Sequence, residues 1–179
     1  RKDSVAFVNR YAGKQPFFVM VNHYAPHIPH MSTKEAFERT KKRWIAEGRD
    51  TEKIDAEKFS VHRDILYAAM VEEMDMNVGA LIDALKAKGQ LDNTYFIFTS
   101  DNGGGHSRKI KVDGEQRRFN GPLQDGKRSI FEGGIRVPTI IAGPRIKAGS
   151  QCDVPIVQWD FLPTFHDLGG SKAPMPEGV

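Results

Sequence analysis

The stretch of sequence that decides the fold is Tyr95-Phe96-Ile97-Phe98-Thr99-Ser100-Asp101-Asn102-Gly103-Gly104. Five of its first six residues are aromatic or β-branched, which is typical of a buried strand. Two side chains that carry oxygen ligands, Asp101 and Asn102, follow directly where the apolar run ends. In an α/β protein with a parallel sheet, ligands bind at the carboxyl ends of the strands. The stretch therefore predicts a buried strand that presents Asp101 and Asn102 as candidate ligands of a hard cation.

A hairpin turn is the alternative interpretation of Asn102-Gly103, because Asn-Gly is the strongest short hairpin signal. That interpretation requires a second strand soon afterwards, and residues 105–118 are almost wholly polar. The sequence therefore favours a loop that bears ligands, with the turn as the alternative.

Composition bounds the class of protein. The chain has 179 residues, of which 39% are hydrophobic and 27% charged, as expected for one globular domain. No apolar run approaches the roughly 18 residues that a membrane span requires. The net charge is only +3 and no basic stripe occurs, so we expect no nucleic-acid partner. The single cysteine, Cys152, excludes an internal disulfide and a thiolate metal cluster.

The strongest periodicity lies in residues 57–88 and predicts a long helix that faces the core. Its apolar positions are Leu66, Met70, Met74, Val78, Leu81 and Leu85, three or four residues apart. Further helices are expected in residues 1–15, 33–49 and 159–168, and further buried strands in residues 17–21 and 137–142.

Two more groups of residues could carry chemistry. His23, His27 and His30 follow the strand expected at 17–21, but Pro26 and Pro29 forbid the regular helix on which this spacing would suit zinc. Histidines on a surface loop are therefore the favoured interpretation. Lys127 lies in the glycine-rich segment 120–138, where the backbone can approach a ligand closely, although the spacing is not that of a phosphate-binding P-loop.

Taken together, these motifs resemble the sulfatase family of the alkaline-phosphatase superfamily. The residues that carry the resemblance are Pro16-Phe17-Phe18, Ala25-Pro26-His27-Ile28-Pro29, Tyr67 to Gly89, Leu91-Asp92-Asn93-Thr94, Thr99-Ser100-Asp101-Asn102-Gly103, Gly121-Pro122-Leu123 to Lys127, Glu132-Gly133-Gly134-Ile135-Arg136-Val137-Pro138 and Asp160-Phe161-Leu162-Pro163-Thr164. They cover nearly the whole chain in the family's order.

The resemblance implies a fold and a set of roles. The fold would be α/β, an alkaline-phosphatase-like sheet flanked by helices, with residues 1–179 forming a single partial catalytic domain that lacks N- and C-terminal parts. Asp101 and Asn102 match the family's calcium (Ca2+) ligands. His27 matches the histidine that contacts the sulfate ester and helps the leaving oxygen depart, and Lys127 matches the lysine that binds sulfate oxygens. Both would be catalytic and substrate-binding.

The partner implied by the resemblance is a sulfate ester, either a small molecule or a sulfated glycan, and the compartment it suggests is periplasmic or secreted. Long polar connections beside an active-site crevice contact the non-reacting part of a ligand, so we expect segments 31–60 and 105–119 to choose the substrate.

One departure from the family pattern concerns the nucleophile. Sulfatases use a formylglycine made from a Cys/Ser-x-Pro/Ala-x-Arg motif, which lies before the Pro-His-x-Pro stretch together with an Asp-Asp calcium pair. This chain has neither, and Cys152 is followed by Asp153-Val154-Pro155-Ile156. We therefore expect an internal part of a sulfatase that is inactive alone.

Two alternatives stay open. A phosphatase or phosphonate hydrolase of the same superfamily usually has Asp-His-Gly where this chain has Asp101-Asn102-Gly103, because imidazole suits zinc and an amide oxygen suits calcium. A non-catalytic anion-binding module on the sulfatase scaffold would also lack the nucleophile.

Overall fold

The computed structural model describes residues 2–49, 51, 61–105, 109–112, 115–118 and 120–175. The chain forms two compact units, Arg1–Pro144 and Arg145–Val179. The first unit holds the helices α1 (Lys2–Tyr11), α2 (Lys34–Ala46), α3 (Val61–Ala87) and α4 (Glu132–Ile135), the 3-10 turn η1 (Leu91–Asn93), and the strands β1 (Phe96–Thr99), β2 (Lys109–Val112), β3 (Glu115–Arg118) and β4 (Thr139–Ala142). The second holds the 3-10 turn η2 (Gln158–Asp160) and helix α5 (Phe161–Leu168).

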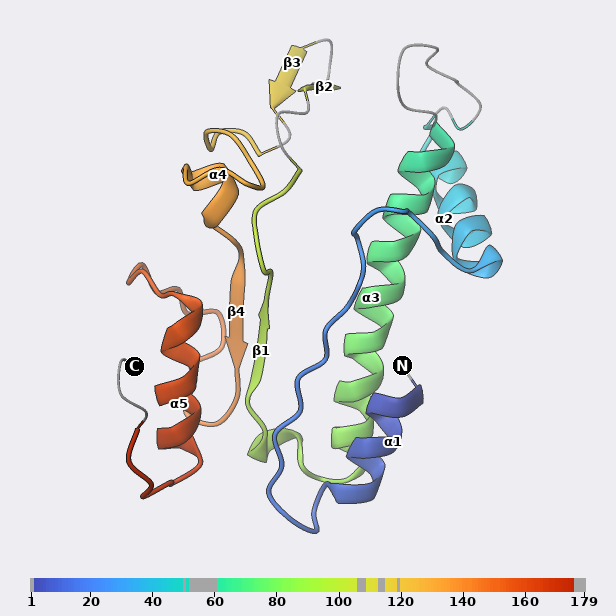
Figure 1. The fold of residues 1–179 in the computed structure, drawn as a ribbon. Coiled ribbons are helices and arrows are strands. Elements are labelled where there is room, and N and C mark those ends of the chain that lie inside the picture. The colour runs from blue at the N-terminus through green and yellow to red at the C-terminus, as the bar shows by residue number, and fades with distance from the viewer. Residues whose placement is uncertain are drawn as a thin grey trace. The chain divides into compact units, whose positions relative to one another are not determined.

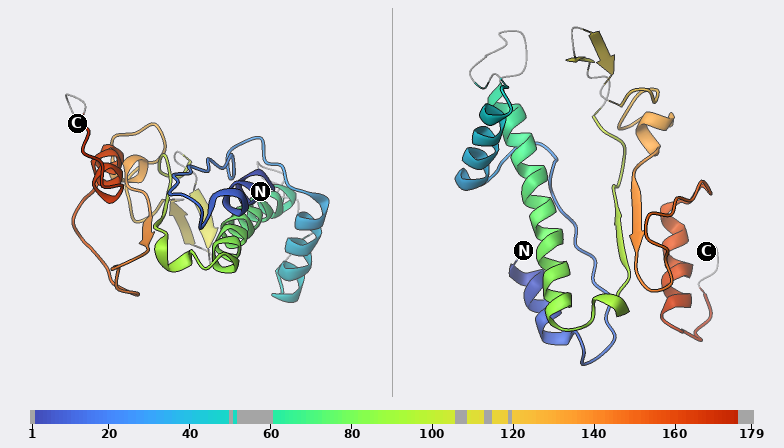
Figure 2. Two further views of the ribbon diagram at one scale, coloured as in Figure 1. Left: turned by 90° about the horizontal axis from the view of Figure 1, so that it is seen from below. Right: turned by 180° about the vertical axis from the view of Figure 1, so that it is seen from behind.

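Helix α3 is the long helix that the periodicity predicts, and α1 and α2 both pack against it (Figure 1). Figure 2 shows α2 beside the amino-terminal half of α3 and α1 beside its carboxyl-terminal half. Met70 and Leu85 are buried as expected, whereas the other four predicted core positions are half-buried. The small residues Ala69 and Ala84 are buried as well. Small residues allow neighbouring helices to approach closely.

The central core lies where α1, the end of α3 and the start of β1 meet. Its buried members are Val8, Ala12, Ala84 and Leu85, with Val5, Phe17, Leu81, Leu91 and Phe96 packed against them. This core fixes where β1 begins. From this core, β1 runs toward the loops that carry the candidate site (Figure 1).

The strands predicted near residues 95–100 and 137–142 are confirmed, but they do not form a parallel sheet. Strand β1 pairs with β4 in an antiparallel ladder, with Phe98 opposite Ile140 and Thr99 opposite Thr139. The two threonine hydroxyl oxygens lie 3.1 Å apart across the ladder. The expectation of a parallel arrangement was wrong for this pair, since strand direction depends on a partner that is 40 residues away and that the local pattern does not reveal.

The prediction of full burial was also wrong for these strands. Side-chain exposure is 37% for Phe98 and 62% for Ile140. In the part of the chain that the structure describes, the sheet of β1 and β4 has only these two strands. A two-stranded sheet cannot cover both of its own faces, so apolar side chains on each strand remain in contact with solvent.

Residues 17–21 do not form the buried strand that their composition predicts. The segment is extended but has no strand partner among the described residues, and Phe18 and Met20 are 65% and 70% exposed. A run of apolar residues indicates a strand only if a neighbouring strand supplies hydrogen bonds, and tertiary context did not provide one here.

Residues 105–119, expected to be a polar loop, contain a hairpin instead. Strands β2 and β3 pair with each other, with Lys109 opposite Arg118, and form a sheet separate from β1. The alternation in Lys109-Ile110-Lys111-Val112 is the strand signal that overall polarity concealed. Residues 50, 52–60, 106–108, 113–114 and 119 of the two segments predicted to choose the substrate lie outside the described residues.

The remaining helices follow their local signals. Helix α2 begins after Thr33, whose side chain accepts a hydrogen bond from the Ala36 N–H. In the second unit, the Asp160 carboxylate accepts a 2.7 Å hydrogen bond from the Val157 N–H, and the short helix α5 ends at Gly169 as predicted. Cys152 is an exposed free thiol. None of the helices in the described residues is long and apolar enough to cross a membrane.

Candidate active site

The loop after β1 presents Asp101 and Asn102 at the end of the strand. Asp101 is exposed, and its carboxylate has no hydrogen bond or ion pair within the described ranges. The Asn102 amide nitrogen donates to the Gly103 carbonyl over 2.8 Å, which leaves the amide oxygen of Asn102 as an acceptor. One carboxylate and one amide oxygen are therefore available at adjacent positions.

A second loop, residues 120–136, lies directly against this one. The Gly103 N–H donates to the Gly134 carbonyl, and the Lys127 N–H donates to the Gly104 carbonyl, both over 2.8 Å. These two hydrogen bonds join segments that are more than twenty residues apart in sequence. They bring the backbone of Lys127 next to the loop that carries Asp101 and Asn102.

The close approach of the two loops depends on glycine. A Cβ atom on Gly103 would lie 1.9 Å from the Gly133 carbonyl oxygen, and one on Gly126 would lie 2.8 Å from the Gly104 carbonyl oxygen. Neither distance is compatible with a side chain. The glycine-rich composition noted in the sequence is therefore used for contact between two backbones.

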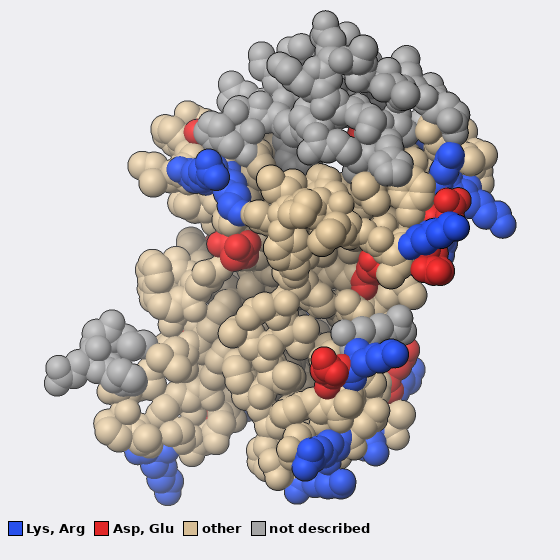
Figure 3. Space-filling model, turned by 45° about the vertical axis from the view of Figure 1, so that its right-hand side comes forward, with Lys and Arg blue, Asp and Glu red and all other residues tan. Residues whose placement is uncertain are grey.

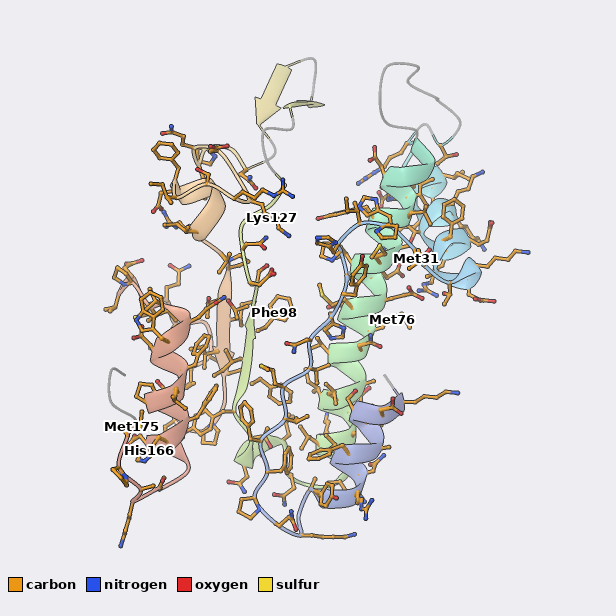
Figure 4. The ribbon with its side chains drawn as sticks, viewed as in Figure 1. Met31, Met76, Phe98, Lys127, His166 and Met175 are labelled. Carbon is orange, nitrogen blue, oxygen red and sulfur yellow. The ribbon has the colours of Figure 1, made fainter. Side chains whose placement is uncertain are left out.

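Lys127 sits in a turn with an unusual backbone. Asp125 and Arg128, on either side of Gly126 and Lys127, have φ angles of 65° and 79°, in the left-handed region that side-chain-bearing residues rarely adopt. The Lys127 side chain is half-buried, and its ammonium has no hydrogen bond or ion pair with any part of the chain that is described. Figure 4 shows Lys127 beyond the carboxyl end of β1.

His27 lies on its own loop and is exposed. Its Nδ1 atom lies 2.7 Å from the Ile28 carbonyl oxygen. A carbonyl oxygen only accepts, so Nδ1 carries a proton and Nε2 is left to face a ligand. Tyr24 supports this arrangement, since its hydroxyl donates to the same carbonyl and its ring packs edge-on against the imidazole.

The structure thus joins the loop that carries Asp101 and Asn102 to the loop that carries Lys127 by backbone hydrogen bonds. The hydrogen bonds of His27 lie within its own loop, from its backbone N–H to the Tyr24 carbonyl and from Nδ1 to the Ile28 carbonyl. The histidine trio does not form a zinc site either, because no group of three His, Cys, Asp or Glu side chains within the described ranges could hold a metal ion. Burial lowers the pKa of His23.

The ligand atoms that Asp101 and Asn102 offer are of the chemical type that calcium binds. Carboxylate and amide oxygens are ligands that calcium prefers, and both belong to a loop held rigidly by backbone hydrogen bonds. Two side chains supply fewer than the roughly six to eight oxygens that calcium takes. Asp101 and Asn102 could therefore be part of a calcium site and not the whole of it.

Sequence reasoning missed Asn120. Its amide nitrogen lies 3.2 Å from the Gly104 carbonyl oxygen and 2.9 Å from the Asp125 carbonyl oxygen. The only sequence signal was an Asn at the start of the glycine-rich segment, which indicates a turn and does not identify a partner 16 residues away.

Two solved structures are similar to this chain in fold. In solved structures, the chain is similar to Ps i-CgsB, crystallised with k-i-k-neocarrahexaose, with a TM-score of 0.72 and 32% identity over 97% of this chain and 34% of that one. It is also similar to yidJ from Bacteroides fragilis, with a TM-score of 0.68 and 25% identity over 98% of this chain and 37% of that one. The fold is α/β of the alkaline-phosphatase-like kind.

The sequence relatives are sulfatases. Human arylsulfatase H is 33% identical over 94% of this chain and 26% of its own length, and human steryl-sulfatase is 40% identical over 63% of this chain and 19% of its own length. The Sulfatase family model matches residues 2–171. The chain belongs to the sulfatase family. It spans about a fifth to a quarter of the length of these two relatives.

Proposed function

We propose that this chain supplies calcium- and sulfate-binding residues to the active site of a sulfuric ester hydrolase. Family membership supports a sulfatase-type hydrolase. The resemblance of the motifs to the family pattern is the basis for the roles given to the individual residues. The observation that carries the proposal is the 2.8 Å hydrogen bond from the Lys127 N–H to the Gly104 carbonyl. Through it, the backbone of Lys127 is joined to the loop that carries Asp101 and Asn102.

Each residue has a distinct task in this proposal. Asp101 and Asn102 would hold calcium, which supplies positive charge near the sulfate group when bound. The Lys127 ammonium binds sulfate oxygens and stabilises negative charge that develops on them. His27 would contact the ester oxygen through Nε2 and, as an imidazolium that carries a proton on each ring nitrogen, would give the Nε2 proton to that oxygen as it leaves, while Nδ1–H donates to the Ile28 carbonyl.

The substrate class in this proposal is a sulfate ester, either a small molecule or a sulfated glycan. Arylsulfatase and steryl-sulfatase relatives support the former, and a structural neighbour solved with a carbohydrate supports the latter. Figure 3 shows acidic and basic side chains interspersed on one face of the described residues, which offers no basic stripe for nucleic acid on that face.

Substitution of Lys127 tests the anion-binding role. Lys127→Met keeps most of the length of the side chain and removes its charge, so we expect sulfate affinity to fall by about tenfold or more, because a charge-assisted contact is lost. Titration with sodium sulfate in the presence of calcium, followed by NMR shifts of the loop amides, measures this affinity. Lys88→Met, on an exposed lysine at the end of α3, is the control. Equal affinity in Lys127→Met and the unmodified chain would refute the role.

Metal analysis separates the proposal from the phosphatase alternative. Asn102 in place of histidine favours calcium, because an amide oxygen is a hard ligand. We expect shifts of the Asp101 and Asn102 amides with calcium and none of comparable size with zinc. A stronger response to zinc would favour the phosphatase or phosphonate hydrolase instead.

A further inference from the structure

We infer that Asn120 is a positioning residue that sets the place of Lys127 relative to Asp101 and Asn102; this inference rests on the proposed function. The amide nitrogen of Asn120 carries two protons, and two carbonyl oxygens lie within reach of it. One belongs to Gly104, in the loop after β1, and the other to Asp125, in the turn before Lys127. A single side chain therefore joins both loops.

The Gly104 carbonyl is the point where the two loops are joined most directly. It accepts the Lys127 N–H over 2.8 Å and the Asn120 amide over 3.2 Å. It follows Asn102 by two residues. The Asn120 amide thus supports the same acceptor that holds the lysine, so a shift of that carbonyl would move Lys127 and the oxygen ligands relative to each other.

The Asp125 contact constrains the turn itself. Asp125 has a left-handed φ of 65°, which costs free energy that surrounding contacts must offset. The 2.9 Å hydrogen bond from Asn120 to its carbonyl is one such contact. The amide is also closely packed, since a Cβ on Gly126 would lie 2.6 Å from its nitrogen.

The two carbonyl oxygens beside the Asn120 amide nitrogen require a hydrogen-bond donor at this position. An acceptor there would face two other acceptors. Aspartate has the same shape as asparagine but would place a carboxylate oxygen against two carbonyl oxygens. Alanine would leave both carbonyls without this donor. Both substitutions should therefore loosen Lys127, although only alanine changes the size of the side chain.

Amide hydrogen exchange of the full chain, measured by NMR, tests the inference. In Asn120→Ala and Asn120→Asp we expect the Lys127 and Gly103 amides to exchange about tenfold faster, because local opening becomes easier when hydrogen bonds are lost. Amides in α3 should be unchanged. Asn93→Ala is the control, since the Asn93 amide nitrogen is exposed and lies 3.5 Å from Gln90 Oε1 in a turn outside the site.

A sulfate titration of the same samples tests whether the position of Lys127 affects sulfate binding. We expect sulfate affinity, read from the Lys127 amide, to fall about tenfold in both Asn120 variants while the calcium response of Asp101 is retained. Unchanged exchange at Lys127, or an equal rise in α3, would overturn the inference. If the unmodified chain shows no sulfate response, the proposed function fails, and the exchange measurement still decides the role of Asn120.

Discussion

At the residue scale, three glycines allow close backbone packing at the site, Gly103 between the two loops and Gly133 and Gly134 within the loop 120–136. Gly103, Gly133 and Gly134 each have a backbone carbonyl oxygen of another residue where a Cβ atom would stand, at distances of 1.9, 2.2 and 2.1 Å. Both loops therefore depend on the absence of a side chain at these positions. The loops that carry Asp101 and Lys127 owe their close backbone contact to neighbours that carry no chemistry.

Gly103→Ala should separate the loops. The added methyl group would lie 1.9 Å from the Gly133 carbonyl oxygen, and overpacking of this kind costs about 1–3 kcal/mol. We expect a loss of that size in the free energy of unfolding from chemical denaturation, together with faster exchange of the Lys127 amide. Gly105→Ala is the matched control, because a Cβ there meets nothing within 4 Å. Equal stability of the two variants would contradict this account.

At the scale of elements, the carboxylate of Glu72 holds α2 against α3. It accepts hydrogen bonds from Arg39 and from the fully buried Thr40, each over 2.7 Å, and lies 3.8 Å from Arg43. Burial by itself raises the pKa of Glu72. The hydrogen bonds and the charges of both arginines outweigh that effect, so the pKa lies below its ordinary value of 4.5.

Glu72→Gln should destabilise the helix pair. A hydrogen bond to a charged group is lost, which costs about 1.5–3 kcal/mol, at the lower end here because Arg39 is partly exposed. The folded pKa is depressed, so this stabilisation is fully present above pH 4.5 and disappears as pH falls through the lower folded value. Denaturation curves between neutral and acidic pH check both statements.

The control for Glu72 is an exposed ion pair. Arg136 and Glu132 lie 3.2 Å apart with side chains 68% and 57% exposed, so Glu132→Gln should change the free energy of unfolding by less than about 0.5 kcal/mol. If Glu72→Gln shows the same pH dependence as the unmodified chain, the carboxylate is not the group that titrates.

Elements were predicted well where the signal is local. The apolar periodicity of α3 depends on residues three or four positions apart, and helices α2 and α3 formed where they were expected. Strand direction and the burial of residues 17–21 depend on partners far along the chain. Those predictions were wrong for that reason.

At the scale of the whole molecule, we predict no sulfatase turnover by these 179 residues alone. They contain no Cys/Ser-x-Pro/Ala-x-Arg motif from which a formylglycine nucleophile could be made. Binding residues without a nucleophile can hold an ester but cannot split it. Assay of the chain on an aryl sulfate, beside a longer form of the protein that carries the motif, checks this. Appreciable hydrolysis by the 179 residues would refute it, whereas an inactive longer form would favour the non-catalytic module.

The sequence by itself determined the family, the helices and the identity of the four candidate residues, because motifs, periodicity and donor chemistry are written locally. Tertiary structure decided that β1 and β4 are antiparallel, that residues 17–21 stay exposed, and that Asn120 joins two loops. Each of these depends on backbone groups that are distant in sequence. Backbone carbonyl and N–H groups are chemically the same in nearly every residue, so residue type does not reveal their partners. Such groups leave no mark in the sequence, so only the folded chain shows which of them meet.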